Sequence, residues 1–168
     1  RCIMQRVYSL LVDNNSGVLS RISGLFTRRG YNIDSITAGV TADPRFTRIT
    51  IVSSGDEIIL SQIEKQIAKL EDVIVVKVLK PEESVYRELI LVKIRANAQQ
   101  RSEIVSIADI FRAKIVDAER ESLVIELTGT QSKLEAFLQL LDGYEILELA
   151  RTGIAGLSRG IKDVTFIE

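Results

Sequence analysis

The sequence contains no histidine, no tryptophan and a single cysteine among its 168 residues. Without histidine there is no Ser-His-Asp or Cys-His machinery, no His-ligated metal and no imidazole to act as a general base near neutral pH. The single thiol, Cys2, excludes an internal disulfide, a redox CxxC pair and a zinc-cysteine cluster, so we interpret it as an inert thiol suited to a reducing compartment. These absences argue against most hydrolase chemistry.

The sequence also lacks an excess of positive or negative charge, and it lacks long apolar runs. The chain carries 22 basic and 23 acidic side chains, a net charge of -1, and only four tyrosines and five phenylalanines as aromatics. A balanced chain has no sequence-wide field to steer it to nucleic acid, and it has no run of ~18 apolar residues to cross a membrane. We therefore expect no nucleic-acid partner and no membrane partner.

The first 79 residues show a regular alternation of strand and helix patterns. The predicted elements are, in order, a strand at 7–12, a helix from Val18, strands at 32–40 and 47–52, a helix after the capping sequence 54–57 and a strand at 73–79. Ser16 could cap the first helix and Gly30 could end it. The apolar faces of the two helices are predicted to comprise Val18, Leu19, Ile22, Leu25 and Phe26, and Ile59, Ile63, Ile67 and Leu70.

The second half repeats this order after residues 80–85, which we interpret as a linker. The predicted elements are a strand at 86–96, a helix with Ile104 and Ala108 on its apolar face, strands at 114–118 and 123–127, a helix capped by Thr130 and a strand at 144–150. The order β-α-β-β-α-β is the split βαβ or ferredoxin-like arrangement, in which one sheet face carries both helices and the other is uncovered. We therefore predict an α+β protein of two ferredoxin-like βαββαβ units, at 1–79 and 86–160.

A glycine-rich segment closes the second unit, with three of the ten glycines at positions 153, 156 and 160. Such a segment is not a helix. It could be a frayed tail, or Ile154 and Leu157 could dock on a surface. Residues 161–168 form a final tail to which the sequence assigns no role.

The loop at 13–17 (DNNSG) is the most informative candidate site, because it places amide and hydroxyl groups at the positive end of the first helix. Free backbone N–H groups and the helix dipole there favour an anion, and Gly17 lets a ligand approach the backbone closely. An ordinary capped turn is the alternative. Asn14 and Asn32 are neutral amides that both donate and accept, which suits a zwitterion, although Asn32 could serve only its own backbone.

Three classes of function can be compared. An RNA-binding sheet needs exposed aromatics on its central strands, whereas Tyr8 and Phe46 are isolated. An enzyme needs a nucleophile with a base or a perturbed carboxylate pair, and no pattern marks either; the acidic residues at 117, 119 and 121 lack bracketing ligands and favour a solvated turn over a cation site. The remaining class is a binding module whose sheet face and edges pair with another subunit.

Several segments resemble the regulatory (small) subunit of acetohydroxyacid synthase, also called acetolactate synthase. They are DNNSGVLSR at 13–21, RRGYNI at 28–33 and ARTG at 150–153, supported by QIEKQ at 62–66, ELILVKI at 88–94 and DIFR at 109–112. The resemblance runs from about Val7 to Gly160.

The resemblance implies an N-terminal ACT domain, which senses amino acids, followed by a C-terminal domain of related topology. In this family the N-terminal domains pair, and an amino-acid effector, usually valine, binds at their interface near the first helix. The residues that match the effector site are Asn14, Gly17 and Asn32, with Asp13, Ser16 and Ile33 as weaker neighbours. The family therefore implies at least a homodimer.

The resemblance also implies a separate catalytic large subunit that uses thiamine diphosphate, Mg²⁺ and FAD to condense pyruvate with a second 2-oxo acid. It implies no cofactor, metal or catalytic residue in this chain, which would stimulate its partner in branched-chain amino acid biosynthesis and confer feedback inhibition by valine. An ACT-type sensor of a different biosynthetic enzyme is the alternative. The expected location is the cytoplasm in a bacterium or the plastid stroma in a photosynthetic eukaryote.

Overall fold

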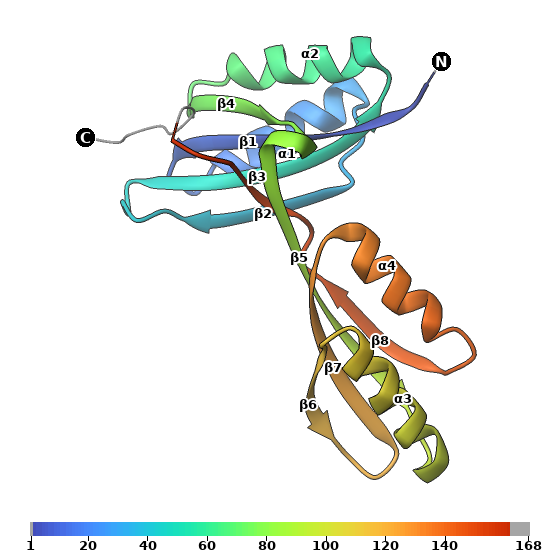
Figure 1. Cartoon of the computed structure of the whole chain (residues 1–168). Coiled ribbons are helices and arrows are strands. Elements are labelled where there is room, and N and C mark those ends of the chain that lie inside the picture. Colours follow the sequence, from blue (N-terminus) through green and yellow to red (C-terminus); the bar gives the residue numbers. More distant parts are fainter. Residues whose placement is uncertain (1, 162–168) are drawn as a thin grey trace. The chain divides into compact units, whose positions relative to one another are not determined.

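The computed structural model describes residues 2–161 and divides the chain into two compact units. The first unit runs from the N-terminus to Tyr86 and resumes at Ile154, and the second unit is Arg87–Gly153. Both have the β-α-β-β-α-β order of elements (Figure 1), which confirms the predicted α+β class. The predicted tail at 161–168 lies, apart from Ile161, outside the described residues.

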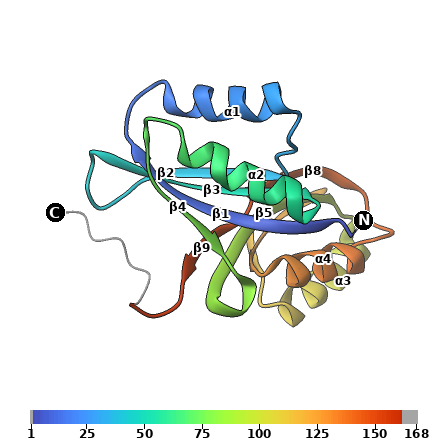
Figure 2. The ribbon, with the colours of Figure 1, turned by 90° about the horizontal axis from the view of Figure 1, so that it is seen from above.

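The first unit is an antiparallel sheet with the strand order β2-β3-β1-β4. Its elements are β1 (Met4–Asp13), α1 (Val18–Arg29), β2 (Ser35–Val40), β3 (Phe46–Gly55), α2 (Glu57–Ala68) and β4 (Val73–Leu79). Within this unit both helices lie on the same side of the strands (Figures 1 and 2). Gly30 ends α1 in the left-handed conformation (φ 67°), and Asp56 caps α2 by accepting a 2.9 Å hydrogen bond from the backbone N–H of Ile59.

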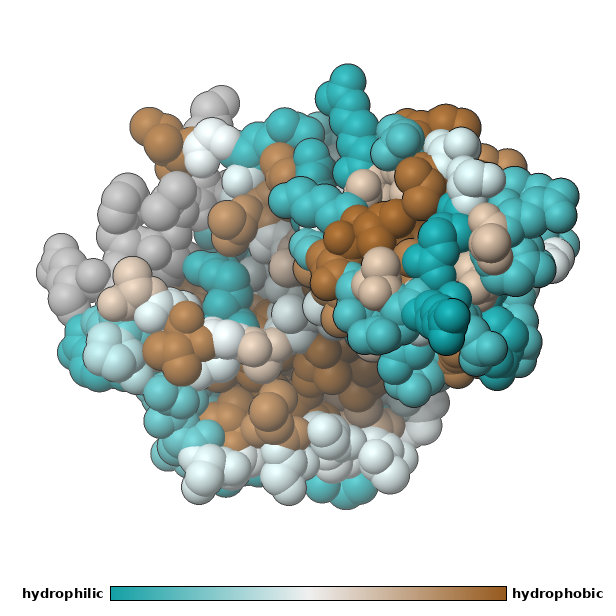
Figure 3. Space-filling model, turned by 90° about the horizontal axis from the view of Figure 1, so that it is seen from below, coloured by the Kyte–Doolittle hydropathy of each residue, from teal (hydrophilic) through white to brown (hydrophobic). Residues whose placement is uncertain are grey.

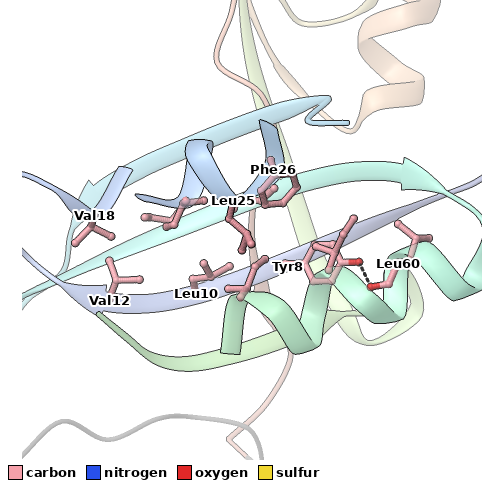
Figure 4. Packing of buried hydrophobic residues seen from close by; sticks show 12 residues of the cluster. Tyr8, Leu10, Val12, Val18, Leu25, Phe26 and Leu60 are labelled. Atoms are coloured by element: carbon pink, nitrogen blue, oxygen red, sulfur yellow. Dashed lines mark hydrogen bonds between the residues drawn. The ribbon is translucent and has the colours of Figure 1, made fainter. Parts of the chain in front are cut away.

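The core of this unit lies between the sheet and its helices. Alternate residues of β1, namely Tyr8, Leu10 and Val12, point to the helices because side chains alternate along a strand. The Tyr8 hydroxyl donates a 2.6 Å hydrogen bond to the backbone carbonyl of Leu60 in α2 (Figure 4). Burial raises the pKa of Tyr8 to about 12.

The opposite face of this sheet is partly covered, contrary to the sequence-based expectation of an open face. Val7, Val52 and Leu79 form a second buried cluster with Ile154, which is only 6% exposed. Ile154 is followed by β9 (Ala155–Ser158), which pairs with β5. The glycine-rich segment is therefore a contact segment up to residue 158 and not a frayed tail.

The side chains of Leu79 and Tyr86 come so close to the backbone at position 156 that only a glycine fits there without displacing them. A Cβ atom at Gly156 would come within 3.0 Å of the side chains of Leu79 and Tyr86. The Tyr86 hydroxyl donates a hydrogen bond to the Leu79 carbonyl, and the Arg159 N–H donates to the Glu83 carbonyl at 2.8 Å. The stretch at 80–85 is thus not a free linker: a 3-10 turn (Pro81–Glu83) leads into β5 at Ser84.

The second unit repeats the topology with the strand order β6-β7-β5-β8. Its elements are β5 (Ser84–Arg95), α3 (Ala98–Ile110), β6 (Lys114–Ala118), β7 (Ser122–Gly129), α4 (Gln131–Leu140) and β8 (Ile146–Arg151). Thr130 caps α4 as predicted, and Asn97 with Gln100 forms a capping box at α3. The core comprises buried residues of β5 and β7 packed against both helices.

Residues 151–153 anchor the end of β8. Arg151 binds the buried Glu88 carboxylate through two hydrogen bonds, of 2.9 and 3.1 Å. The Thr152 hydroxyl accepts a 3.1 Å hydrogen bond from the backbone N–H of Leu89. Gly153 then adopts a left-handed conformation (φ 82°), which an L side chain rarely tolerates. The chain leaves the second unit at this turn.

Some local predictions were wrong. The second strand begins at Ser35 and not at residue 32, because the Asn32 carbonyl accepts a hydrogen bond from the Ser53 hydroxyl instead of a strand partner. Leu19 and Ile59 are 47% and 37% exposed, and Leu60 takes the core position on α2. The buried face of α1 is therefore narrower than predicted, and that of α2 begins one residue later.

Apolar side chains also remain on the surface, where Figure 3 shows them in patches among hydrophilic ones. In the second unit they include Ile115 and Val116 on β6, and Ile146, Leu147 and Leu149 on β8, the two edge strands. Within residues 2–161, none of the helices has the length and apolar character needed to span a membrane.

Candidate functional site

The candidate loop connects β1 to α1, and the structure exposes its polar residues. Gly17 is the N-cap residue of α1, and no side chain makes a capping hydrogen bond there. The expectation that Ser16 caps this helix is therefore wrong; Ser16 is an exposed turn residue. Asn15 performs part of that task, because its Oδ1 accepts a 3.2 Å hydrogen bond from the Gly17 N–H.

Asn14 is tied to the turn between β2 and β3. Its Nδ2 donates to the Pro44 carbonyl at 2.9 Å, and its Oδ1 accepts from the Thr47 hydroxyl at 3.2 Å. Its backbone N–H donates to the Arg45 carbonyl at 2.8 Å. Both ends of the Asn14 amide therefore have protein partners, which fixes the orientation of the side chain at the surface.

A cluster of Asn15, Arg21 and Asp72 joins the loop to the segment that precedes β4. Arg21 Nε donates to one Asp72 carboxylate oxygen, and Asn15 Nδ2 donates to the other at 3.0 Å. Arg21 Nη2 also donates to Asn15 Oδ1 at 2.9 Å, so each residue contacts the other two. Hydrogen bonds from Arg21 and then Asn15 lower the pKa of the Asp72 carboxyl, which keeps this carboxylate ionised.

Gly17 leaves room for the Arg21 guanidinium. A Cβ atom at position 17 would lie closer than 3.0 Å to Arg21 Nη1. The helix geometry brings these groups together, since side chains of an α-helix lean toward its N-terminus and reach the turn before their own Cα. A side chain at position 17 would therefore force the Arg21 guanidinium to move from this position.

Asn32 lies just beyond the other end of α1. Its Nδ2 donates to Asp34 Oδ1 at 2.7 Å, and the adjacent Ile33 packs against the core of the first unit. The 12 residues of α1 separate Gly17 from Asn32, a length of ~18 Å at the usual helical rise. The structure therefore does not bring Asn14 and Gly17 together with Asn32 within one chain.

Asp13, the remaining predicted neighbour, ends β1. Its backbone N–H donates to the Asp72 carbonyl at 2.9 Å, and its side chain is exposed. Asp72 thus accepts hydrogen bonds from the loop through both its backbone carbonyl and its carboxylate.

Sequence reasoning missed Arg21 and Asp72 as site residues. Arg21 could have been found, because it follows Gly17 by four residues and one helical turn places its side chain over that glycine. Asp72 gives no comparable signal, since 51 residues separate it from Arg21. Within the described residues, no group of three or more histidine, cysteine, aspartate or glutamate side chains could hold a metal ion.

Comparisons with known proteins agree across both units. A family model for the ACT domain of small subunits of acetohydroxyacid synthase (AHAS) matches residues 8–75, and one described as the small subunit of acetolactate synthase matches residues 87–160. The chain is 48% identical over 160 residues to the acetolactate synthase isozyme 3 small subunit of Escherichia coli, covering 95% of this chain and 98% of that protein.

A relative from a second organism and a solved structure give the same result. The chain is 48% identical over 155 residues to a probable acetolactate synthase small subunit of Methanothermobacter thermautotrophicus, covering 92% of each. It also matches the crystal structure of an acetolactate synthase small subunit from Thermotoga maritima, with a TM-score of 0.87, 42% identity and coverage of 94% of this chain and 99% of that one. This chain belongs to the family of acetolactate synthase small subunits.

Proposed function

We propose that this chain is the non-catalytic regulatory subunit of an acetolactate synthase, which stimulates a separate catalytic large subunit and makes it sensitive to valine. The observation that carries the proposal is the match, over 95% of the chain, to small subunits of that enzyme. Thiamine diphosphate, Mg²⁺ and FAD would belong to the catalytic partner. The pathway served would be the biosynthesis of valine, leucine and isoleucine.

The effector site is proposed to lie between two copies of the chain. Asn14 and Gly17 lie at one end of α1 and Asn32 at the other, and the helix between them is ~18 Å long. One valine molecule is too short to reach both ends within a chain. A two-fold pair of first units with the helices oppositely directed would bring the start of one α1 near the Asn32 of its partner. Edge strand β2, whose last three residues are exposed, supports such pairing.

The chemistry of the proposed site suits a free amino acid. The carboxylate of valine would lie at the backbone N–H groups of the first turn of α1, where the helix dipole favours an anion. Its ammonium group would meet amide or backbone carbonyl oxygens of Asn32 from the partner. Leu19, 47% exposed in that first turn, would offer apolar contact to the isopropyl group.

The test is to mix the chain with its catalytic large subunit and measure acetolactate formation with and without valine, leucine and isoleucine. We expect stimulation by the chain and inhibition of the stimulated enzyme by valine. A coupling of roughly 5- to 150-fold in affinity is typical of such allosteric pairs. No stimulation at any ratio of subunits would refute the regulatory role, and turnover by the chain alone would refute its non-catalytic character.

A second measurement separates this function from a sensor of another enzyme. Calorimetric titration of the chain with each of the twenty amino acids should detect binding of a branched-chain amino acid. Binding of only serine or an aromatic amino acid would instead favour a different biosynthetic enzyme as the partner.

A further inference from the structure

Arg21 and Asp72 hold part of the exposed loop at 14–17 in one conformation. No regular element includes these residues, and the helix that follows has no side-chain cap. The turn between β2 and β3 holds Asn14, and two other side chains hold Asn15: Arg21, one turn into α1, and Asp72, just before β4.

We propose that Arg21 and Asp72 are positioning residues for the amino-acid effector, acting through Asn15 to hold the loop in the conformation that binds it. This inference rests on the proposed function of the loop. It assigns a role to two residues that do not need to touch the effector themselves.

The geometry of the Arg21 fork supports this role. Nε donates to Asp72 and Nη2 donates to Asn15, while Nη1 lies where a Cβ atom at position 17 would clash with it. The planar guanidinium therefore binds two partners at once in a fixed geometry, which a lysine ammonium on a flexible stem cannot reproduce. The side chain of Asp72 is only 15% exposed, whereas that of Arg21 is 51% exposed. The carboxylate is thus the fixed end of the pair.

Gly17 also leaves space for the Arg21 guanidinium, in addition to its proposed place at the effector. A Cβ atom at position 17 would displace the Arg21 guanidinium. A substitution of Gly17 is then expected to act largely through Arg21. This differs from simple obstruction of the effector, and the difference can be measured.

The experiment is a double-mutant cycle on the full chain, with valine affinity measured by calorimetry for the wild type, Gly17→Ala, Arg21→Ala and the double variant. Each single variant should bind valine about 3- to 30-fold more weakly, the effect of losing one or two charge-assisted hydrogen bonds. In the Arg21→Ala background, Gly17→Ala should add less than about twofold, because the group it displaces is already gone. Asp72→Asn and Arg21→Lys should also weaken binding.

A matched control is available in the second unit. Arg95, 52% exposed, donates to Glu145 at 2.8 Å and so resembles Arg21 in exposure and chemistry. Arg95→Ala should leave valine affinity unchanged, and thermal unfolding of every variant would verify that it folds. If the effects of Gly17→Ala and Arg21→Ala are additive, or if neither Arg21→Ala nor Asp72→Asn changes affinity, the inference is overturned while the proposed function stands. If the wild-type chain binds no amino acid, the proposed function fails and the inference with it.

Discussion

Arg151 and Glu88 form a two-point ion pair across strands β8 and β5, with the Glu88 side chain only 6% exposed. Glu88 raises the pKa of Arg151, mainly through these hydrogen bonds. Arg151 lies two residues before Gly153, where the second unit ends. It therefore holds the end of the second unit in place at the point where the chain leaves it.

Removing Arg151 should destabilise the second unit. Arg151→Ala leaves the buried Glu88 carboxylate without its cation, and a lost charged hydrogen-bonded pair of this kind costs about 2 kcal/mol. Urea unfolding monitored by residue-specific signals of the second unit would measure this loss. Arg95→Ala, which breaks an exposed pair with Glu145, should cost less than about 0.5 kcal/mol; equal costs would contradict the prediction.

Removing the Tyr8 hydroxyl should destabilise the first unit. Tyr8→Phe leaves the buried carbonyl of Leu60 without its 2.6 Å hydrogen bond, which should lower the free energy of unfolding by about 1–3 kcal/mol. Tyr144→Phe provides the comparison, because the Tyr144 hydroxyl donates at 2.6 Å to the exposed Glu103 at the surface of the second unit. The Tyr144 variant should lose clearly less stability in chemical unfolding.

Tyr8 also predicts how stability depends on alkaline pH. Its pKa rises from 10.0 to about 12 in the folded chain, mainly through burial. The neutral phenol is favoured by folding, so this contribution is fully present below pH 10 and is lost as the pH rises from 10 to about 12. Between these values Tyr8→Phe should show a shallower fall in unfolding free energy than the wild type. If the unfolding free energy falls equally steeply with pH in the wild type and in Tyr8→Phe, this prediction is contradicted.

The returning segment should stabilise the first unit through Ile154. Ile154→Ala opens a cavity beside Val7, Val52 and Leu79, and we expect a loss of about 2 kcal/mol because the cluster is small and near the surface. Leu157→Ala is the matched control, since Leu157 is 58% exposed and should change stability by less than about 0.5 kcal/mol. Equal stability of the two variants would show that the segment does not pack as described.

Valine sensitivity should depend on both ends of α1. Gly17→Asp and Asn32→Ala are each expected to reduce inhibition by valine of the reconstituted enzyme at least tenfold, if two copies of the chain share the site. Mixing the two variants gives the decisive measurement: a dimer holding one chain of each carries one intact site built from the two unaltered ends. Partial recovery of valine inhibition in the mixture is expected, and no recovery would argue against a shared site.

The order of strands and helices could be predicted from local patterns. Periodic apolar residues and capping groups such as Asp56, Thr130 and Gly30 act within a few residues, so their effect can be seen in the sequence. The boundaries differ from the prediction where a distant group intervenes, as at Asn32, whose carbonyl accepts a hydrogen bond from the Ser53 hydroxyl of another strand.

The candidate loop was also found from its residue types, but its contacts were not. The amide of Asn14 is engaged by the turn at Pro44, and Arg21 is bound by Asp72 from a segment 51 residues away. No local rule brings these partners together, because they meet only when the sheet and both helices are packed.

The sequence by itself determined the two βαββαβ units, the helix ends marked by Gly30 and Thr130, and the family to which the chain belongs, since each depends on short-range patterns or on runs of matching residues. Only the tertiary structure decided that Ile154 returns to cover the first sheet, that Gly17 and Asn32 lie at opposite ends of α1, and that Arg21 and Asp72 hold the loop. The reason is physical: these relationships join residues far apart in the chain, and packing alone determines which of them meet.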